Sequence, residues 1–344
     1  MRLGLHLGHW ERRPWDAVEL VREAERLGFD SVWTSEAWGS DAVTTLAWVA
    51  AHTTTIGLGT AVMQIPARSP AMTAMTAITL DHLTGGRFRL GLGVSGPQVA
   101  EGWHGMPFDD PLGRTREYVD IVRTVLRRER PLEHHGRHYD LPLRGGTGLG
   151  RALKVGVVPL RREVPLYLAA LGPRNVALAA EIADGWLPIL SSPERSDLFR
   201  GALEEGFDRR GGRPEGFDVA PLVPLEVGED MAACRDRVRP FVARYVGGMG
   251  APGANFYHAL VRRYGFGRAA EQIQDRYLSG RRGEAAAAVP DELIDQLALI
   301  GPRERIRERL NAWREAGTTT LLVRTSEPAA LRVLCEAAGR EVSR

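Results

Sequence analysis

The stretch Thr76–Pro97, TAITLDHLTGGRFRLGLGVSGP, decides the fold class of this 344-residue chain. A helical segment runs into the double glycine Gly85–Gly86, which can take the positive φ of a helix C-cap. The strand that follows, Phe88–Val94, alternates apolar residues with Gly91 and Gly93, and these glycines leave one side open to another backbone or a flat ligand. By itself this pattern fits a packed barrel corner and a ligand site equally well.

Strand and helix patterns alternate along the rest of the chain, which favours a parallel sheet or barrel. Eight strand patterns occur, near residues 3, 31, 56, 88, 165, 186, 218 and 320. Eight such units predict a TIM (β/α)8 barrel, an α/β fold, and we expect one domain over residues 1–344. A β-hairpin insertion is expected near 132–160 and a helical excursion that could cover a site near 230–282. A doubly wound open sheet is the alternative, weakened because no GxGxxG follows the first strand.

Composition and charge exclude several functional classes. The net charge is only +2, from 45 basic and 43 acidic residues, so we expect neither nucleic acid nor an anionic membrane as a partner. No apolar run approaches the roughly 20 residues of a membrane helix, and no secretion signal is recognisable, so we expect a cytoplasmic protein. Cys234 and Cys335 have no metal or redox spacing.

Common catalytic motifs are also missing from the sequence. Lys154 is the only lysine, which argues against Schiff-base and P-loop chemistry. No GxSxG, HExxH or EF-hand loop occurs. His134, His135 and His138 lie close together, but in the expected insertion and without a matching carboxylate in the pattern, so no metal site is expected.

Polar and aromatic side chains gather at the expected carboxyl ends of the first four strands, where a TIM barrel holds its active site. They are His6, His9, Trp10, Glu36, Trp38, Gln64, Ser95, Gly96, Trp103 and His104. Each of these residues, taken alone, is explained more simply as an ordinary packed or solvated side chain than as part of a site. Their convergence on one rim favours a site.

The segment Tyr167–Arg174, YLAALGPR, has the features of an anion-binding helix start. Unsatisfied amides at a helix N-terminus carry partial positive charge, Gly172 lets a phosphate approach the backbone, and Pro173 suits the first turn. A plain strand-to-helix turn explains the segment about as well.

Taken together, these residues resemble the luciferase-like flavin monooxygenase superfamily, and within it the branch of coenzyme F420-dependent oxidoreductases. The resemblance covers essentially the whole chain. The most specific motif is LDHLTGGRFRLGLG at 80–93, joined by FDSVWTSEAW at 29–38, IGLGTAVMQIPARSP at 56–70, AALGPR at 169–174 and ADGWLP at 183–188. It implies a TIM barrel with insertions, a homodimer, and hydride transfer through a flavin or deazaflavin at the carboxyl-terminal rim.

The resemblance also implies which residues hold the cofactor. Ala61 and Val62 would form a bulge against the flat ring, with a non-prolyl cis peptide as in similar deazaflavin enzymes. Ser95 and Gly96 would line the cofactor after the fourth strand. The phosphate would be held by Ala170, Leu171, Gly172 and Pro173, which agrees with the helix-start argument made from the residues.

One departure from the family limits the substrate prediction. The sugar-phosphate dehydrogenase branch carries an Asp-His pair after strand two and a Glu after strand four, where this chain has Glu36, Ala37 and Pro97. Sugar dehydrogenation is therefore not expected. Glu36 remains a candidate proton donor or polar anchor. The substrate-pocket candidates are His6, His9, Trp38, Gln64, Trp103 and His104.

The cofactor assignment is coenzyme F420, with FMN as the alternative. The arginine-rich composition suits a GC-rich genome, and with it the actinobacteria in which the deazaflavin is common. An FMN-dependent monooxygenase and a non-catalytic cofactor-binding barrel are the other hypotheses. The substrate is expected to be a small molecule, and the sequence does not identify it.

Overall fold

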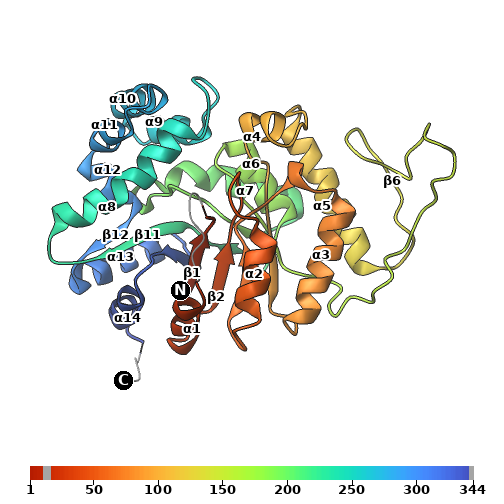
Figure 1. The fold of residues 1–344 in the computed structure, drawn as a ribbon, viewed down its shortest axis with the longest axis horizontal. Coiled ribbons are helices and arrows are strands. Elements are labelled where there is room, and N and C mark those ends of the chain that lie inside the picture. Colours follow the sequence, from red (N-terminus) through yellow and green to blue (C-terminus); the bar gives the residue numbers. More distant parts are fainter. Residues whose placement is uncertain (11–16, 341–344) are drawn as a thin grey trace.

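The fold is a curled parallel sheet surrounded by helices (Figure 1). The computed structural model describes residues 1–10 and 17–340. The strands of the sheet are β1 (Arg2–Gly8), β2 (Ser31–Thr34), β3 (Gly57–Thr60), β4 (Met63–Gln64), β5 (Phe88–Gly93), β8 (Leu166–Leu168), β9 (Gly185–Trp186), β10 (Asp218–Val219), β11 (Leu222–Val227), β12 (Leu299–Gly301) and β13 (Thr320–Arg324).

The sheet closes on itself as a barrel. Its pairings run in the order β10-β9-β8-β5-β3-β2-β1-β13-β11. β10 pairs with β9 and β11 pairs with β13, and because these two segments follow each other in the chain, they act as one strand that joins the two ends of the sheet. A bridge between Ile189 and Leu222 adds to this seam. All eight predicted strands are present, and the TIM-barrel prediction is confirmed.

The contacts of Gly91 explain why strand β5 needs a glycine at this position. Its N–H donates to the Thr60 hydroxyl oxygen at 2.9 Å, and that hydroxyl donates to the Gly91 carbonyl at 2.9 Å. A Cβ on Gly91 would overlap the Thr60 carbonyl oxygen, and one on Gly93 would lie 2.6 Å from a Val62 methyl group. The close backbone approach predicted for this strand is therefore present.

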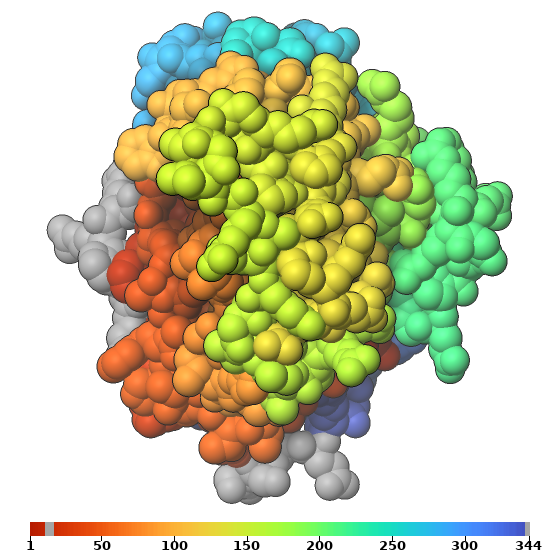
Figure 2. All heavy atoms as spheres, turned by 90° about the vertical axis from the view of Figure 1, so that its right-hand side faces the viewer, coloured from red at the N-terminus to blue at the C-terminus, as the bar shows by residue number. Residues whose placement is uncertain are grey.

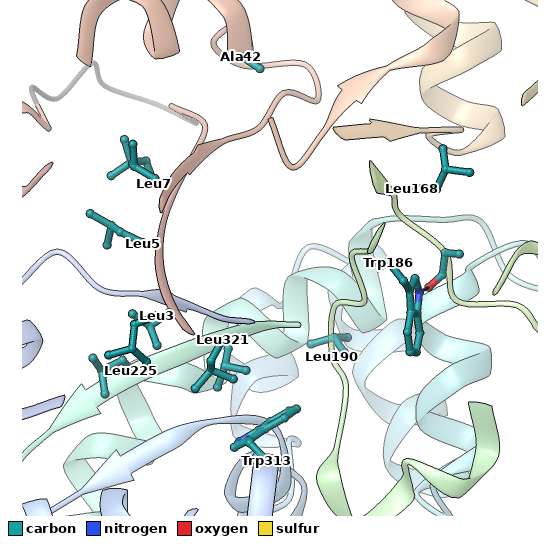
Figure 3. Close-up of a cluster of buried hydrophobic side chains, with 14 of the residues drawn as sticks. Leu3, Leu5, Leu7, Ala42, Leu168, Trp186, Leu190, Leu225, Trp313 and Leu321 are labelled. Carbon is teal, nitrogen blue, oxygen red and sulfur yellow. Dashed lines mark hydrogen bonds between the residues drawn. The ribbon is translucent and has the colours of Figure 1, made fainter. Parts of the chain in front are cut away.

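Strand alternation divides the side chains of the barrel into two sets. Leu3, Leu5 and Leu7 of β1 are buried on its outer side and belong to the main apolar core (Figure 3). The inside holds a smaller cluster in which Trp33 and Tyr167 pack edge to face, with ring centroids 5.1 Å apart. His6 alternates with the outer leucines, so it lies inside the barrel.

Two of the helices that cover the sheet, α2 and α3, begin with side-chain caps. Asp41 accepts from the N–H groups of Val43 and Thr44, and Ser69 accepts from that of Met72. The covering helices are α1 (Val18–Arg26), α2 (Ala42–Ala50), α3 (Pro70–Leu83), α5 (Pro111–Arg127), α6 (Pro173–Ile182), α7 (Asp197–Arg210), α13 (Arg303–Glu315) and α14 (Pro328–Ala337).

The predicted helical excursion between β11 and β12 forms a group of helices over one end of the barrel (Figure 1). Its elements are α8 (Met231–Ala243), a π-helix (Arg244–Gly248), α9 (Phe256–Arg263), α10 (Gly267–Leu278), α11 (Arg282–Ala287) and α12 (Asp291–Leu297). β12 was not expected. It is a three-residue strand beside β11, too short to show alternation in the sequence.

Two local features shape the ends of the third and fourth barrel strands. The segment 57–64 is divided into β3 and β4. The segment after β5 contains the short helix α4 (Pro97–Gly102), which starts at a proline after the extended Gly96.

The predicted insertion contains a small antiparallel pair, β6 (His134–His135) with β7 (Asp140–Leu141). The chain that follows this pair lies over the side of the molecule (Figure 2). None of the helices in the described part of the chain combines the length and apolar character that a bilayer crossing requires.

Candidate active site

A cavity of about 1020 Å³ opens at the carboxyl ends of the barrel strands. It lies where the sequence predicts the site, and it is lined by nearly all the predicted residues: His6, His9, Glu36, Trp38, Ala61, Val62, Gln64, Ser95, Gly96, Trp103, Ala170, Leu171, Gly172 and Pro173. In the described part of the chain, Trp10 and His104 are the predicted rim residues that do not line it.

The predicted bulge lies between β3 and β4. The Ala61–Val62 peptide bond is cis, as the family resemblance implies. The Ala61 N–H donates to the Thr34 carbonyl at 2.6 Å, and the Val62 carbonyl accepts from the Glu36 N–H at 3.2 Å. The bulge is thus held against the exit of β2, and both of its residues line the cavity.

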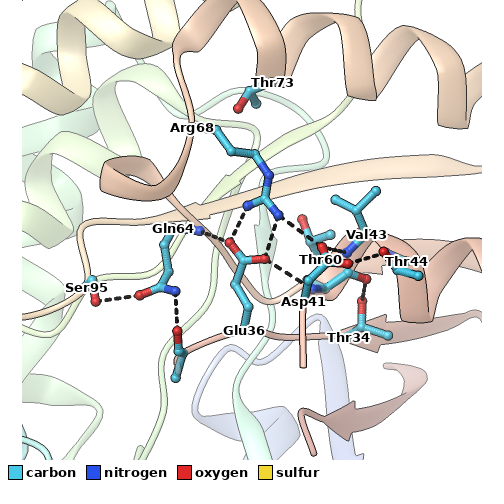
Figure 4. A network of polar contacts seen from close by, with 12 residues as sticks. Thr34, Glu36, Asp41, Val43, Thr44, Thr60, Gln64, Arg68, Thr73 and Ser95 are labelled. Carbon is cyan, nitrogen blue, oxygen red and sulfur yellow. Dashed lines mark hydrogen bonds and ion pairs between the residues drawn. The ribbon is translucent and has the colours of Figure 1, made fainter. Parts of the chain in front are cut away.

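Behind the bulge, Glu36 is the centre of a network of polar contacts (Figure 4). Its Oε1 accepts from the Gln64 backbone N–H at 2.8 Å, and its Oε2 accepts from the Ala42 N–H at 3.1 Å. The Arg68 guanidinium donates to both oxygens and also reaches Asp41 at 3.0 Å. Glu36 therefore makes the contacts of a polar anchor, one of the two roles predicted for it.

Gln64 carries this network to the next strand. Its Nε2 donates to the Ala37 carbonyl at 2.8 Å, and its Oε1 accepts from the Ser95 hydroxyl at 2.8 Å. Ser95 is a non-glycine residue with φ of +63°, the left-handed region. The network thus fixes the exits of β2, β4 and β5 relative to one another.

The far end of the cavity is formed by the start of α6. Gly172 is the extended N-cap residue and has no side chain to satisfy the first amides of the helix. A Cβ at Gly172 would meet no atom within 4 Å, so the backbone is open on the cavity side. Arg174 and Asn175 also line this end. The arrangement suits an anionic group, as predicted.

Two histidines line the opposite side, and both are neutral at pH 7. Burial, and then the positive charge of Arg324, lowers the pKa of His6 to about 3. Burial, followed by Arg244 and Arg324, lowers the pKa of His9 to about 4.

The helical excursion contributes an aromatic wall that the site prediction did not include. Tyr245 and Tyr257 pack edge to face with centroids 4.9 Å apart, and both line the cavity. Phe256 approaches Phe108 of the loop after β5, with centroids 6.4 Å apart. The sequence indicated only that this segment could cover a site, because its aromatic residues follow no strand.

His104 lies behind the cavity wall and not on its surface. Its Nε2 is buried with no hydrogen-bond partner in the described residues, and burial lowers its pKa. It follows the last turn of α4, a helix that was not predicted. Its neighbour Trp103 lines the cavity and is 67% exposed, so it lies at the mouth.

The insertion histidines have the carboxylate partners that the sequence pattern did not reveal. His134 lies 3.2 Å from Glu117, His135 lies 2.6 Å from Asp140, and His138 lies 3.1 Å from Asp110. Each pairs with a different carboxylate. Over residues 1–10 and 17–340, no group of three or more potential ligands is placed to hold a metal ion.

Comparison with known proteins agrees with this geometry. The sequence profile of the luciferase-like monooxygenase family matches residues 2–320. The chain belongs to this family.

Several members of the luciferase-like family are similar over most of their length. A Mycobacterium tuberculosis protein, named provisionally as a coenzyme F420-dependent oxidoreductase, is 49% identical over 94% of this chain and 94% of its own. The 5,10-methylenetetrahydromethanopterin reductase of Archaeoglobus fulgidus is 29% identical over 88% of this chain and 87% of its own.

The fold of this family member also matches a solved structure. The coenzyme F420-dependent tetrahydromethanopterin reductase of Methanopyrus kandleri superposes with a TM-score of 0.79, at 24% identity, over 99% of this chain and 98% of that one. At this identity the likeness concerns the fold alone.

Proposed function

We propose that this protein is a coenzyme F420-dependent oxidoreductase that transfers a hydride between the deazaflavin and a small organic substrate. The observation that carries the proposal is the single cavity that joins a backbone bulge, at Ala61 and Val62, to the open start of α6 at Gly172. The 49% identity to the mycobacterial relative over nearly all of both chains supports F420 as the cofactor.

The cavity residues fit such a cofactor. Ala61 and Val62 would support the flat ring from behind, with Ser95 and Gly96 along its edge. The first amides of α6, with Ala170, Leu171, Gly172 and Pro173, would bind the phosphate, since the N-cap glycine leaves these donors uncovered. When bound, the deazaflavin supplies the hydride chemistry.

The substrate would enter on the side of His6 and His9, between Trp38 and Trp103 at the mouth. Glu36 would act as a polar anchor, because Arg68 and two backbone N–H groups occupy its oxygens. Gln64 would hold Ser95 in place while presenting its side chain to the cavity. The aromatic wall of Tyr245, Phe256 and Tyr257 would exclude water from the substrate.

The proposal is tested by titrating the purified protein with F420 and, separately, with FMN, and following fluorescence. We expect quenching at micromolar F420 and turnover of some alcohol, imine or unsaturated carbonyl. If FMN binds and F420 does not, the protein is an FMN-dependent monooxygenase. Binding without turnover would favour a non-catalytic barrel, and failure of both cofactors to bind would refute the enzymatic proposal.

A variant of the helix start makes the test specific. In Gly172→Val the Cβ would meet no atom within 4 Å, so we expect the fold to be retained while the added side chain obstructs the approach to the first α6 amides. We expect F420 affinity to fall about tenfold or more. Gly201→Ala is the matched control, since Gly201 lies within α7 and its Cβ would also meet no atom within 4 Å.

We further propose a homodimer that forms through an apolar face on α3 and the insertion. The exposed apolar side chains of this face are Met72, Met75 and Leu83 from α3, and Leu153, Val158 and Leu160 from the insertion. His82 of α3 lies 2.8 Å from the Val158 carbonyl, which ties the two segments together. Exposed apolar patches of this kind mark interaction sites.

Light scattering of Met75→Glu tests the dimer, with Leu278→Glu on α10 as the exposed control. We expect only the first variant to become monomeric. A monomeric wild-type protein would refute the proposal.

Cys234 and Cys335 are both free and buried, which supports a cytoplasmic location, and fractionation of the source cells would test that.

A further inference from the structure

Two tyrosine hydroxyl groups in the aromatic wall have no hydrogen-bond partner within the protein. Tyr245 and Tyr257 both line the cavity, and in the described part of the chain no donor or acceptor meets either hydroxyl. By contrast, the hydroxyl of Tyr264, which is buried outside the cavity, donates to the Leu190 carbonyl at 2.9 Å. A buried tyrosine hydroxyl usually finds such a partner. The two wall hydroxyls are therefore left over by the contacts within the chain.

The same two hydroxyl groups open into the cavity. Among the described residues, the polar side-chain atoms that are both unpartnered and sealed from solvent include Nδ1 of His6 but neither of these oxygens, so each oxygen keeps accessible surface. Burial is the main cause that raises the pKa of Tyr245 and of Tyr257, so neither hydroxyl lies in bulk water at the outer surface. An accessible oxygen that is surrounded by protein, on a residue that lines the cavity, faces the cavity.

The polar side chains behind the bulge are already bonded to one another. Glu36 accepts from Arg68 and from two backbone N–H groups. Gln64 uses its amide nitrogen on the Ala37 carbonyl and its amide oxygen on the Ser95 hydroxyl. The wall hydroxyls take no part in this network, so they remain available to a ligand.

The charge state of the wall hydroxyls decides what kind of ligand they suit. Both are protonated at pH 7, because the ordinary tyrosine pKa of about 10 is raised further here. A protonated phenol is a hydrogen-bond donor. The positive charges of Arg324 and Arg244 act on Tyr245 in opposition to burial, so its surroundings favour an oxygen with partial negative charge. A carbonyl oxygen is such a group, and it accepts hydrogen bonds without donating any.

We propose that the pair of Tyr245 and Tyr257 supplies the hydrogen-bond donor that holds the carbonyl oxygen of the substrate, so that the pocket takes ketones or aldehydes in preference to hydrocarbons of the same shape. This inference rests on the proposed function. The donor orients the substrate and stabilises partial negative charge on its oxygen.

Matched ligands that differ only in the acceptor test this inference. Cyclohexanone carries a carbonyl oxygen where methylenecyclohexane carries a CH₂ group, and the wild type should bind the ketone more tightly, both without cofactor and with saturating oxidised F420. Tyr245→Phe and Tyr257→Phe each remove one hydroxyl. In at least one of these variants the ketone Kd should rise about threefold to tenfold, while the alkene Kd changes less than about twofold.

Tyr264→Phe is the control, because it removes a tyrosine hydroxyl outside the cavity. It leaves the Leu190 carbonyl without its donor, so this variant should unfold more easily and yet bind both ligands as the wild type does. The two wall variants lose no hydrogen bond within the protein, so their stability should change less.

Four results would overturn the inference. They are a wild type that binds the ketone no better than the alkene, wild-type ketone affinity in both wall variants, equal losses for ketone and alkene, and a weaker F420 affinity in place of a weaker ketone affinity. The last result would assign the hydroxyls to the cofactor. Because the ligands are also compared in cofactor-free protein, these results are separate from the proposed function, which fails if F420 does not bind.

A measurement on the unmodified protein remains decisive even if a variant does not fold. With ¹³C placed at Cζ of the seven tyrosines, each signal reports on the hydrogen bonding of its own hydroxyl. Cyclohexanone should shift one or two of these signals, and methylenecyclohexane should shift none of them. The absence of a ketone-specific shift would contradict the inference.

Discussion

Replacing Arg68 by methionine should destabilise the protein far more than removing an equally well-formed ion pair at the surface. The Glu36 side chain is 5% exposed and that of Arg68 is 19% exposed. Arg68→Met leaves the Glu36 carboxylate buried without its countercharge, which typically costs about 3–5 kcal/mol. Two backbone N–H donors remain on Glu36, so we expect a loss of about 3 kcal/mol, the lower end of that range.

Arg116→Met is the matched control. Arg116 also makes a two-pronged contact, at 2.6 and 2.7 Å from Glu181, but its side chain is 49% exposed. Loss of such an exposed pair should cost below about 1 kcal/mol. Urea unfolding at pH 7 measures both free energies, with the m-values compared to verify two-state behaviour.

A double variant tests the reasoning itself. In Glu36→Gln with Arg68→Met, no unpaired buried charge remains, so the free energy of unfolding should be higher than in Arg68→Met alone. If Arg68→Met costs no more than Arg116→Met, or if the two substitutions at the Glu36 network add simply, the account of Glu36 as a charged anchor is refuted.

Two further predictions concern Gly91 and His6. Gly91→Ala should strongly destabilise the fold, because its Cβ would overlap the Thr60 carbonyl oxygen, whereas Gly201→Ala within α7 should stabilise it by about 0.5–1 kcal/mol; thermal melting of both variants checks this. His6 binds its proton less readily when folded, with a pKa of about 3 against 6.5, so its contribution to stability is fully present above pH 6.5 and is lost as the pH falls toward 3. Between pH 7.5 and 5.5 the wild type should lose on the order of 1 kcal/mol that His6→Phe does not lose, and identical pH slopes in urea unfolding would contradict the burial of this ring.

The barrel was predictable because its signals are local and repeated. Alternation, glycine stops and helix starts recur in each unit, and the carboxyl ends of parallel strands must meet at one edge. For this reason most of the rim residues named from sequence line one cavity. Glycines such as Gly91 were interpretable as close contacts, although only the fold shows that Thr60 is the partner.

What the sequence did not predict depends on contacts between distant segments. The partner of Glu36, Arg68, comes directly after the short 3-10 turn that follows β4, and nothing in its spacing from Glu36 indicates a pair. His104 was placed in the pocket because it follows a strand, but α4 turns it behind the wall. Tyr245, Phe256 and Tyr257 lie 18 or more residues beyond the end of β11 at Val227, so a search of the residues that directly follow strands could not find them.

The aromatic wall has a consequence for how this enzyme could change its chemistry. Tyr245 and Tyr257 pack on each other within the helical excursion, whereas the bulge, the Glu36 network and the start of α6 belong to the barrel. The aromatic wall of the substrate space and the residues that would bind the cofactor are therefore encoded in separate stretches of the chain. A library confined to Tyr245, Phe256 and Tyr257 would reshape the substrate space without replacing any residue proposed to bind the cofactor.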